Sequence, residues 1–190
     1  MSEPLRLAAR VSRVRVPIGF GCGVLVLWLA TPTLATVLAG TMISAIGEAI
    51  RVWAAGHLNK AREVTASGPY RWTAHPLYVG SSVMGVGLAI ACGSAIAAAV
   101  IAGYLMVTLT AAVREEETYL HSRFGHRYDR YRRDGVTDEG RRFSLALALS
   151  NREHRAVVGL ALVVLLLVWK ATYHGTFWRT AGTRFVRPGG

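Results

Sequence analysis

Apolar residues fall in two long blocks that contain no Asp, Glu, Lys or Arg, from Val16 to Gly47 and from Trp72 to Val113. A helix that crosses a bilayer needs about 20 mostly apolar residues. Each block is interrupted by a turn, at 31–33 and at 92–94, and Pro32 disfavours helix at the residue before it. The pattern therefore predicts two helical hairpins, one in each block.

A third apolar run, at 156–169, is shorter than the other two. The charged side chains at its ends can reach the membrane interface, which would let this run span the bilayer as a fifth helix. The connections at 54–74 and 134–153 are polar and are expected to be loops, as is the tail from Thr172. The N-terminus is Arg-rich like a signal peptide, but it lacks a convincing cleavage site, so we expect the first helix to be retained.

These segments predict an all-α fold. We expect a polytopic integral membrane protein with about five transmembrane helices, arranged as two helical hairpins plus a C-terminal helix. The chain is expected to form a single domain, 1–190. Its parts are the first hairpin at 16–53, a core with the second hairpin at 62–133, and the C-terminal helix at 154–173.

Composition and charge agree with a membrane protein. Hydrophobic residues make up 52% of the chain, the mean hydropathy is +0.33, and the formal net charge is +11. The cations lie between the apolar blocks, as in the cytoplasmic loops of membrane proteins, and this placement argues against a nucleic-acid partner. The N-terminus, the 54–74 loop and the segment after Val113 are therefore expected to face the cytoplasm. A fifth span would place Lys170 and Arg179 outside, so the last helix either departs from this rule or lies in the interface.

Two polar clusters would then share one membrane face. The first is the stretch Ser67-Gly-Pro-Tyr-Arg-Trp-Thr-Ala-His-Pro-Leu-Tyr, which ends at Tyr78, and the second begins with Arg114-Glu-Glu-Glu117. The hairpin between them brings both of its ends together. Acidic residues beside a membrane helix need water or a cation, and three consecutive glutamates point around most of a helix. At least one is expected to face Tyr70, His75 and Tyr78, where a cationic cofactor would fit.

The residues of this region resemble a known family. The order is Gly68-Pro-Tyr-Arg-Trp-x-x-His-Pro-x-Tyr-x-Gly80, a hydrophobic hairpin, Glu115-Glu116, and Phe124-Gly-x-x-Tyr-x-x-Tyr131. It closely resembles the isoprenylcysteine carboxyl methyltransferases and their wider membrane relatives, including phospholipid N-methyltransferases, over about 62–133. The resemblance implies a membrane enzyme that uses S-adenosylmethionine at the cytoplasmic face and methylates a lipid-like or small amphiphilic acceptor from the bilayer.

The resemblance also implies a cofactor site, formed by the segment before Ser67, the tyrosine of the turn, the His-Pro-x-Tyr run and one glutamate. A carboxylate suits the amino group or the sulfonium of the cofactor, and aromatic faces attract its cationic methyl group. The implied cofactor-binding residues are Arg62, Glu63, Val64, Thr65, Tyr70, His75, Pro76, Leu77, Tyr78 and Glu116. No residue is assigned as a catalytic base, and no metal site is expected.

Three positions depart from the family pattern. The family commonly has Arg before His-Pro, where this chain has Ala74, and its segment before Ser-Gly often begins with His, where this chain has Arg62. The carboxyl methyltransferases also carry an Arg that holds the substrate carboxylate, and the ungapped match places Ala112 there. These departures put the identity of the acceptor in doubt more than that of the cofactor.

Alternative interpretations remain open at the level of the sequence. His75 can be a helix cap, the tyrosines an interfacial aromatic belt, and Glu115 to Glu117 a solvated helix exit. An NADPH-dependent membrane reductase of the sterol or enone type has a similar C-terminal motif, although it tends to show Asn-Tyr-Phe-Gly-Glu after His-Pro, where this chain has Leu77-Tyr-Val-Gly-Ser81. A non-catalytic membrane subunit is the remaining alternative.

Overall fold

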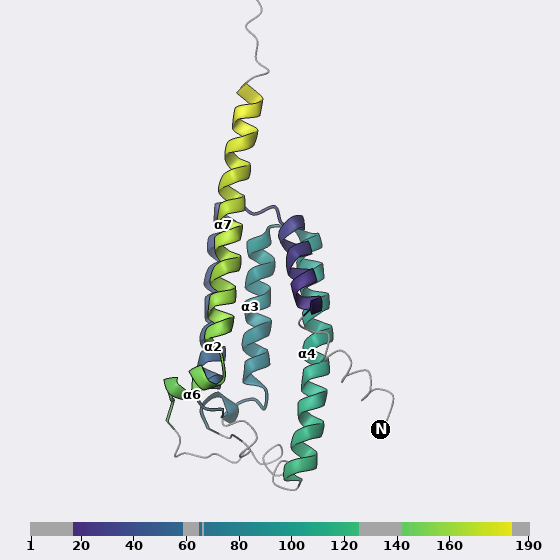
Figure 1. The fold of residues 1–190 in the computed structure, drawn as a ribbon, viewed down its shortest axis with the longest axis vertical. Coiled ribbons are helices and arrows are strands. Elements are labelled where there is room, and N and C mark those ends of the chain that lie inside the picture. The colour runs from purple at the N-terminus through teal and green to yellow at the C-terminus, as the bar shows by residue number, and fades with distance from the viewer. Residues whose placement is uncertain (1–16, 59–64, 66, 126–141, 184–190) are drawn as a thin grey trace, which may run out of the picture.

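The computed structural model describes residues 17–58, 65, 67–125 and 142–183, with side chains over most of these. Every regular element in them is helical, which confirms the all-α prediction. The elements run roughly along one long axis (Figure 1). They are the helix Pro17–Leu29, α2 Leu34–Ala55, the short 3-10 helix η1 Gly68–Arg71, α3 Pro76–Cys92, α4 Ala95–Phe124, α6 Leu145–Ser150 and α7 His154–Thr183.

Three of the described helices are long and apolar enough to cross a membrane: Leu34–Ala55, Ala95–Ser122 and His154–Tyr173. The helices Pro17–Leu29 and Pro76–Cys92 are apolar but shorter. Large apolar side chains such as Trp28 and Met42 point outward, with 77% and 70% of their surface exposed, which suits contact with lipid. The structure therefore has the character of an integral membrane protein, and the count of five spans stays a prediction.

The two predicted turns lie together at one end of the bundle. The Thr31 N–H donates to the Cys92 carbonyl at 2.8 Å, and the Thr31 hydroxyl donates to the Gly93 carbonyl at 2.9 Å. Gly93 has φ +61°, and a Cβ there would lie 2.6 Å from the Thr31 carbonyl oxygen. Thr33 caps α2 and Ser94 caps α4 by accepting hydrogen bonds from backbone N–H groups, which places the helix starts where the sequence predicts them.

The closest helix pair is α2 with α3, which belong to different predicted hairpins. A Cβ on Gly47 would lie 2.6 Å from the Gly80 carbonyl oxygen, and a Cβ on Gly80 would lie 2.7 Å from the Gly47 carbonyl oxygen. Between these positions and the turn end, the Ser44 hydroxyl donates to the Met84 carbonyl at 3.1 Å. Small residues let membrane helices approach until their backbones touch, so the two hairpins are joined along this contact.

The remaining helices pack around this pair. Gly85 of α3 accommodates Leu105 of α4, and Gly19 of the first helix lies against the hydroxyl end of Tyr104. At the turn end, Lys170 of α7 donates from Nζ to the carbonyls of Leu27 and Trp28, at 2.6 and 2.9 Å. These carbonyls are at the C-terminal end of the first helix, where the helix itself supplies no donors. Lys170 therefore caps the first helix, in addition to lying at the end of the apolar run 156–169.

Two features differ from the sequence-based expectation. The expected loop at 134–153 contains the helix α6, which Ser144 caps by accepting from the Leu147 N–H at 3.3 Å. The helix α7 continues to Thr183, so the tail after Thr172 is helical rather than looped over this part. Leu and Ala favour helix, but a run of six residues is too short to form one alone and depends on its cap. The Gly- and Thr-rich tail has a weaker preference and depends on continuity with an existing helix.

Candidate functional site

His75 is positioned by the start of α3. It occupies the N-cap position directly before Pro76, which is well suited to the first position of a helix. Its side chain makes no capping hydrogen bond, which removes the interpretation of His75 as a simple side-chain cap. The His75 N–H is instead held by the Thr73 hydroxyl at 3.3 Å, so the imidazole is left to face other groups.

Those groups are two carboxylates of α4. His75 Nδ1 lies 3.6 Å from Glu116 Oε2, and His75 Nε2 lies 3.6 Å from Glu117 Oε1. The side chain of His75 is 17% exposed, whereas those of Glu116 and Glu117 are 37% and 32% exposed. Both imidazole nitrogens are thus buried beside partly solvated acids. The distances exceed an ordinary hydrogen bond, and both carboxylates keep about a third of their side-chain surface open to water.

The two carboxylates change the acidity of the imidazole. The Glu116 carboxylate raises the pKa of His75 above its usual value of 6.5, burial lowers it, and Glu117 adds to the rise. Because the raising effects prevail, His75 stays protonated at higher pH than a free histidine. The Tyr78 ring lies beside the imidazole, with 5.6 Å between ring centroids and an angle of 32° between the rings. The result is a cation between two acids, flanked by an aromatic face.

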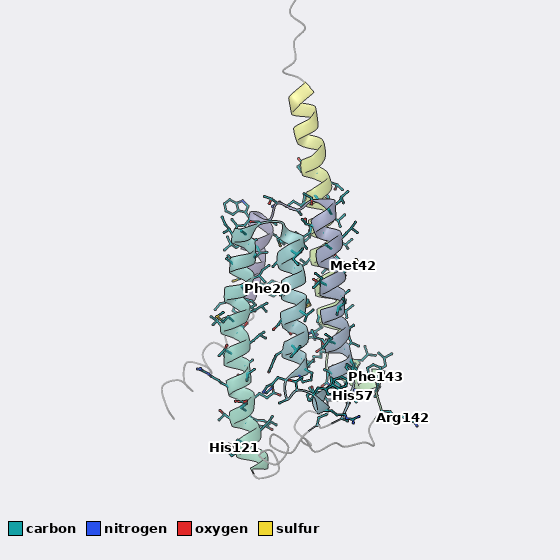
Figure 2. All side chains as sticks on the ribbon, turned by 180° about the vertical axis from the view of Figure 1, so that it is seen from behind. Phe20, Met42, His57, His121, Arg142 and Phe143 are labelled. Carbon is teal, nitrogen blue, oxygen red and sulfur yellow. The ribbon has the colours of Figure 1, made fainter. Side chains whose placement is uncertain are left out.

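The loop before His75 packs against the end of α2. Thr65 and Tyr70 are both buried, with 8% and 7% of their surface exposed, and η1 contacts α2. Gly68 adopts φ +58°, and a Cβ on it would lie 2.7 Å from the ring of His57. A side chain at position 68 would therefore meet both backbone strain and a steric clash. His57 and Phe143 lie together at this end of the bundle, and His121 of α4 lies at the same end (Figure 2).

The structure thus brings together some of the expected site residues. His75, Tyr78 and Glu116 meet at one end of the α3–α4 hairpin, as the sequence predicts. Pro76 is fully buried, and the Leu77 carbonyl accepts a hydrogen bond from Ser81 at 2.9 Å. Thr65 and Tyr70 belong to the buried loop against α2. The expected residues Arg62, Glu63 and Val64 lie outside the described residues, as do Tyr128 and Tyr131.

Sequence reasoning missed Glu117 and a second charged cluster. Neighbouring helix positions are about 100° apart, so two adjacent glutamates can both flank one imidazole. The second cluster contains Glu48, Arg51 and Glu153, with Arg51 Nη2 2.8 Å from Glu153 Oε2. The sequence did contain a signal for this cluster. Glu48 and Arg51 are ionisable residues near the end of an otherwise apolar segment, and such residues are costly in a membrane.

Comparison with known proteins places the chain in a family. The family model described as phospholipid methyltransferase matches residues 23–127, which is more than half of the chain. No curated protein and no solved structure matches at a significant level. The apolar helices fit a membrane methyltransferase family. The chain belongs to the phospholipid methyltransferase family, which confirms the predicted relationship and favours a methyltransferase over a reductase.

The first prediction concerns the pH dependence of stability. The raised pKa of His75 means that the pair with Glu116 contributes stability that is fully present below the unfolded pKa and lost as pH rises through the folded one. The His75→Gln variant should therefore have a lower Tm than the wild type at about pH 6, and the difference should shrink towards about pH 9. Differential scanning calorimetry in detergent measures both values.

The matched control is His121→Gln, because His121 is exposed near the end of the same helix that carries the glutamates. It should show no such trend. A loss of Tm in His75→Gln that is the same at both pH values would mean that the imidazole stabilises the protein by packing alone.

Proposed function

We propose that this protein is an S-adenosylmethionine-dependent methyltransferase that acts at the cytoplasmic membrane face on a lipid-like or small amphiphilic acceptor. The observation that carries the proposal is His75 set between Glu116 and Glu117 beside Tyr78, in a chain of the phospholipid methyltransferase family. Members of this family generally use S-adenosylmethionine.

The chemistry of these residues fits the cofactor. S-adenosylmethionine carries an ammonium and a sulfonium, and when bound it supplies an electrophilic methyl group. Glu116 and Glu117 provide two negative charges against the one positive charge that His75 can hold. The buried nitrogens of His75 lie 3.6 Å from these acids and have no hydrogen-bond partner among the described residues, so they can offer a donor to an anionic group, while the excess of negative charge favours a cation. Tyr78 adds a ring face that attracts cationic methyl groups.

Positioning would be the main contribution of these residues to catalysis. Methyl transfer is an in-line displacement, in which holding the two reactants in the correct geometry lowers the barrier substantially. His75 is the N-cap of α3 and Tyr78 lies in the first turn, and Pro76 restricts the backbone between them. The site therefore rests on a helix start, which is more rigid than a free loop. We assign no general base.

The charge distribution supports a cytoplasmic site. Arg51, Arg114 and Arg155 lie in the helix turns at the site end of the bundle and Arg71 in the short helix η1, whereas the turns at 31–33 and 92–94 contain no Lys or Arg. Membrane proteins keep such cations on the cytoplasmic side. The cofactor is also made in the cytoplasm, so both considerations agree.

The acceptor is constrained by what the site lacks. A substrate carboxylate drawn into a partly dry site needs a cationic partner, and Arg is well suited because its planar group pairs both oxygens. Ala112 stands at the matching position, and the segment 72–113 contains no Lys or Arg. Arg71 and Arg114 are exposed. We infer that the acceptor is not a prenylcysteine carboxylate and is methylated at nitrogen or sulfur.

The second prediction tests the cofactor site. Glu116→Gln should weaken S-adenosylhomocysteine binding about tenfold or more, because a hydrogen bond to a charged group contributes about 1.5–3 kcal/mol. Glu117→Gln should act in the same direction. Glu115→Gln is the matched control, since Glu115 is exposed and precedes the pair on the same helix. Isothermal titration calorimetry measures all three, and equal small effects would favour a solvated helix exit.

The third prediction tests the orientation. In a background without Cys22 and Cys92, a cysteine replacing the exposed His121 should react with a membrane-impermeant thiol reagent only from the cytoplasmic side. A cysteine replacing Ala95, at the other end of α4, should react only from outside. External labelling at position 121 would contradict the cytoplasmic site.

The fourth prediction tests the acceptor. Purified enzyme with labelled S-adenosylmethionine should transfer methyl groups to amphiphiles that carry an amine or a thiol, and should leave N-acetyl-S-farnesylcysteine largely unmethylated. The reason is the missing cation at Ala112. Saturable methyl-ester formation on the farnesylcysteine would refute the inference and would point to Arg71 or Arg114 as the carboxylate partner.

A further inference from the structure

A buried charged cluster joins α2 to the segment before α7 near the site end of the bundle. Arg51 of α2 donates from Nη2 to Glu153 Oε2 at 2.8 Å, and its Nε lies 3.4 Å from Glu48 Oε2. Only 6% of the Glu48 surface and 8% of the Glu153 surface are exposed. Burying such charges costs several kcal/mol each, and replacing a buried ion pair by apolar residues is often neutral or stabilising. Stability alone therefore explains this cluster poorly.

The same arginine reaches the first turns of α3. Arg51 Nη1 donates to the Ser81 hydroxyl, and that hydroxyl donates to the Leu77 carbonyl at 2.9 Å. A continuous chain of polar contacts thus leads from Glu153 through Arg51 to the backbone of Leu77, two residues after His75. Leu77 is itself one of the expected cofactor-binding residues.

Gly80 makes room for this connection. A Cβ on Gly80 would lie 2.7 Å from Arg51 Cγ and 3.1 Å from the Arg51 backbone nitrogen. The arginine side chain therefore passes directly over a position of α3 that has no side chain. Gly80 is also the last residue of the His-Pro-x-Tyr-x-Gly part of the family motif. This part therefore includes both residues of the site and the glycine that leaves space for Arg51.

The segment before α7 fixes Glu153. Asn151 donates from Nδ2 to the carbonyls of Ala55 and Leu58, both at 2.9 Å, and so binds the C-terminal end of α2. The Ser144 N–H donates to the Gly56 carbonyl at 3.1 Å. The connection that contains α6 is thus tied to the end of α2, beside the arginine that Glu153 binds.

We propose that Arg51, held by Glu153, is a positioning residue of the site: through Ser81 it fixes the first turns of α3 and thereby keeps His75 between Glu116 and Glu117. The catalytic meaning of this role rests on the proposed function. The effect of Arg51 on the position of His75 does not rest on that function, because it concerns only the distances between His75 and its two acids. Arg51 is suited to it because its planar group can bind a carboxylate and a hydroxyl at once.

The first test measures His75 directly and needs no cofactor. Among the described residues, the groups that face its imidazole are Glu116 and Glu117 of α4 and Tyr78 of α3. In full-length protein with labelled histidine, the NMR signal of His75 is assigned by its loss in His75→Gln. In Ser81→Ala, the titration midpoint of His75 should fall towards the ordinary value of about 6.5, because the imidazole moves away from its acids.

The matched control is Ser44→Ala. Ser44 also links α2 to α3 by a hydrogen bond from its hydroxyl to a carbonyl, that of Met84, but it lies nearer the turn end. It should leave the His75 titration unchanged. Equal shifts in Ser81→Ala and Ser44→Ala, or no shift in either, would overturn the proposal, because Ser81 would then act only as general helix packing.

The second test uses two milder variants, since Arg51→Ala would leave Glu48 and Glu153 unpaired and unfold the protein. Arg51→Lys keeps the charge but loses the planar group, and Glu153→Gln keeps the shape but loses the charge. Each should weaken S-adenosylhomocysteine binding about three- to tenfold, the range expected for one hydrogen bond. Arg51→Lys should lower the His75 midpoint as Ser81→Ala does, and an unchanged midpoint would contradict the proposal.

The two proposals fail in different ways. If the wild-type protein bound no S-adenosylhomocysteine, the proposed function would be wrong, while a shift of the His75 midpoint in Ser81→Ala would still support the positioning role. If binding were normal in the wild type and both Ser81→Ala and Arg51→Lys left the His75 midpoint unchanged, the positioning role would be wrong and the proposed function would stand.

Discussion

The backbone contact between α2 and α3 is the constraint on which the rest of the molecule depends. In lipid there is little hydrophobic driving force between helices, so their association depends on close packing and on polar links. Gly47 and Gly80 provide that packing, because a side chain on either would collide with the backbone of the other helix. Only at this separation can Arg51 pass over α3 and reach Ser81. The position of His75, which is the N-cap of α3 and six residues before Ser81, follows from this contact and from the packing of α3 on α4.

Much of the fold follows from the sequence because membrane helices are delimited by simple signals. Long runs without charge set the spans, and Pro32, Pro76 and Gly93 set their ends. The helix α6 and the extension of α7 could not be predicted in this way. They depend on the Ser144 cap and on the continuation of an apolar helix into a segment with mixed composition.

Part of the site can also be predicted from the sequence, because the ends of the predicted helices determine which residues lie close together. Because α3 and α4 form a hairpin, the end that carries His75 must lie near the end that carries Glu116, and the family resemblance points to the same residues. The involvement of Glu117 depends on helix rotation, which an apolar helix does not reveal. The link between Arg51 and Glu153 joins residues far apart in the chain through a polar connection, and no periodic pattern predicts such a pairing.

The bond from Lys170 to the first helix has a consequence for how the protein is made. The carbonyls of Leu27 and Trp28 belong to a helix that is synthesised well before α7, whereas the amine that caps them lies in α7 itself. Unsatisfied carbonyls are costly in a membrane. Until residue 170 has been inserted, the first helix must expose these groups to water or to lipid headgroups. The turn end of the bundle is therefore completed only after α7 has been synthesised, so a helix made early acquires its cap from a helix made later.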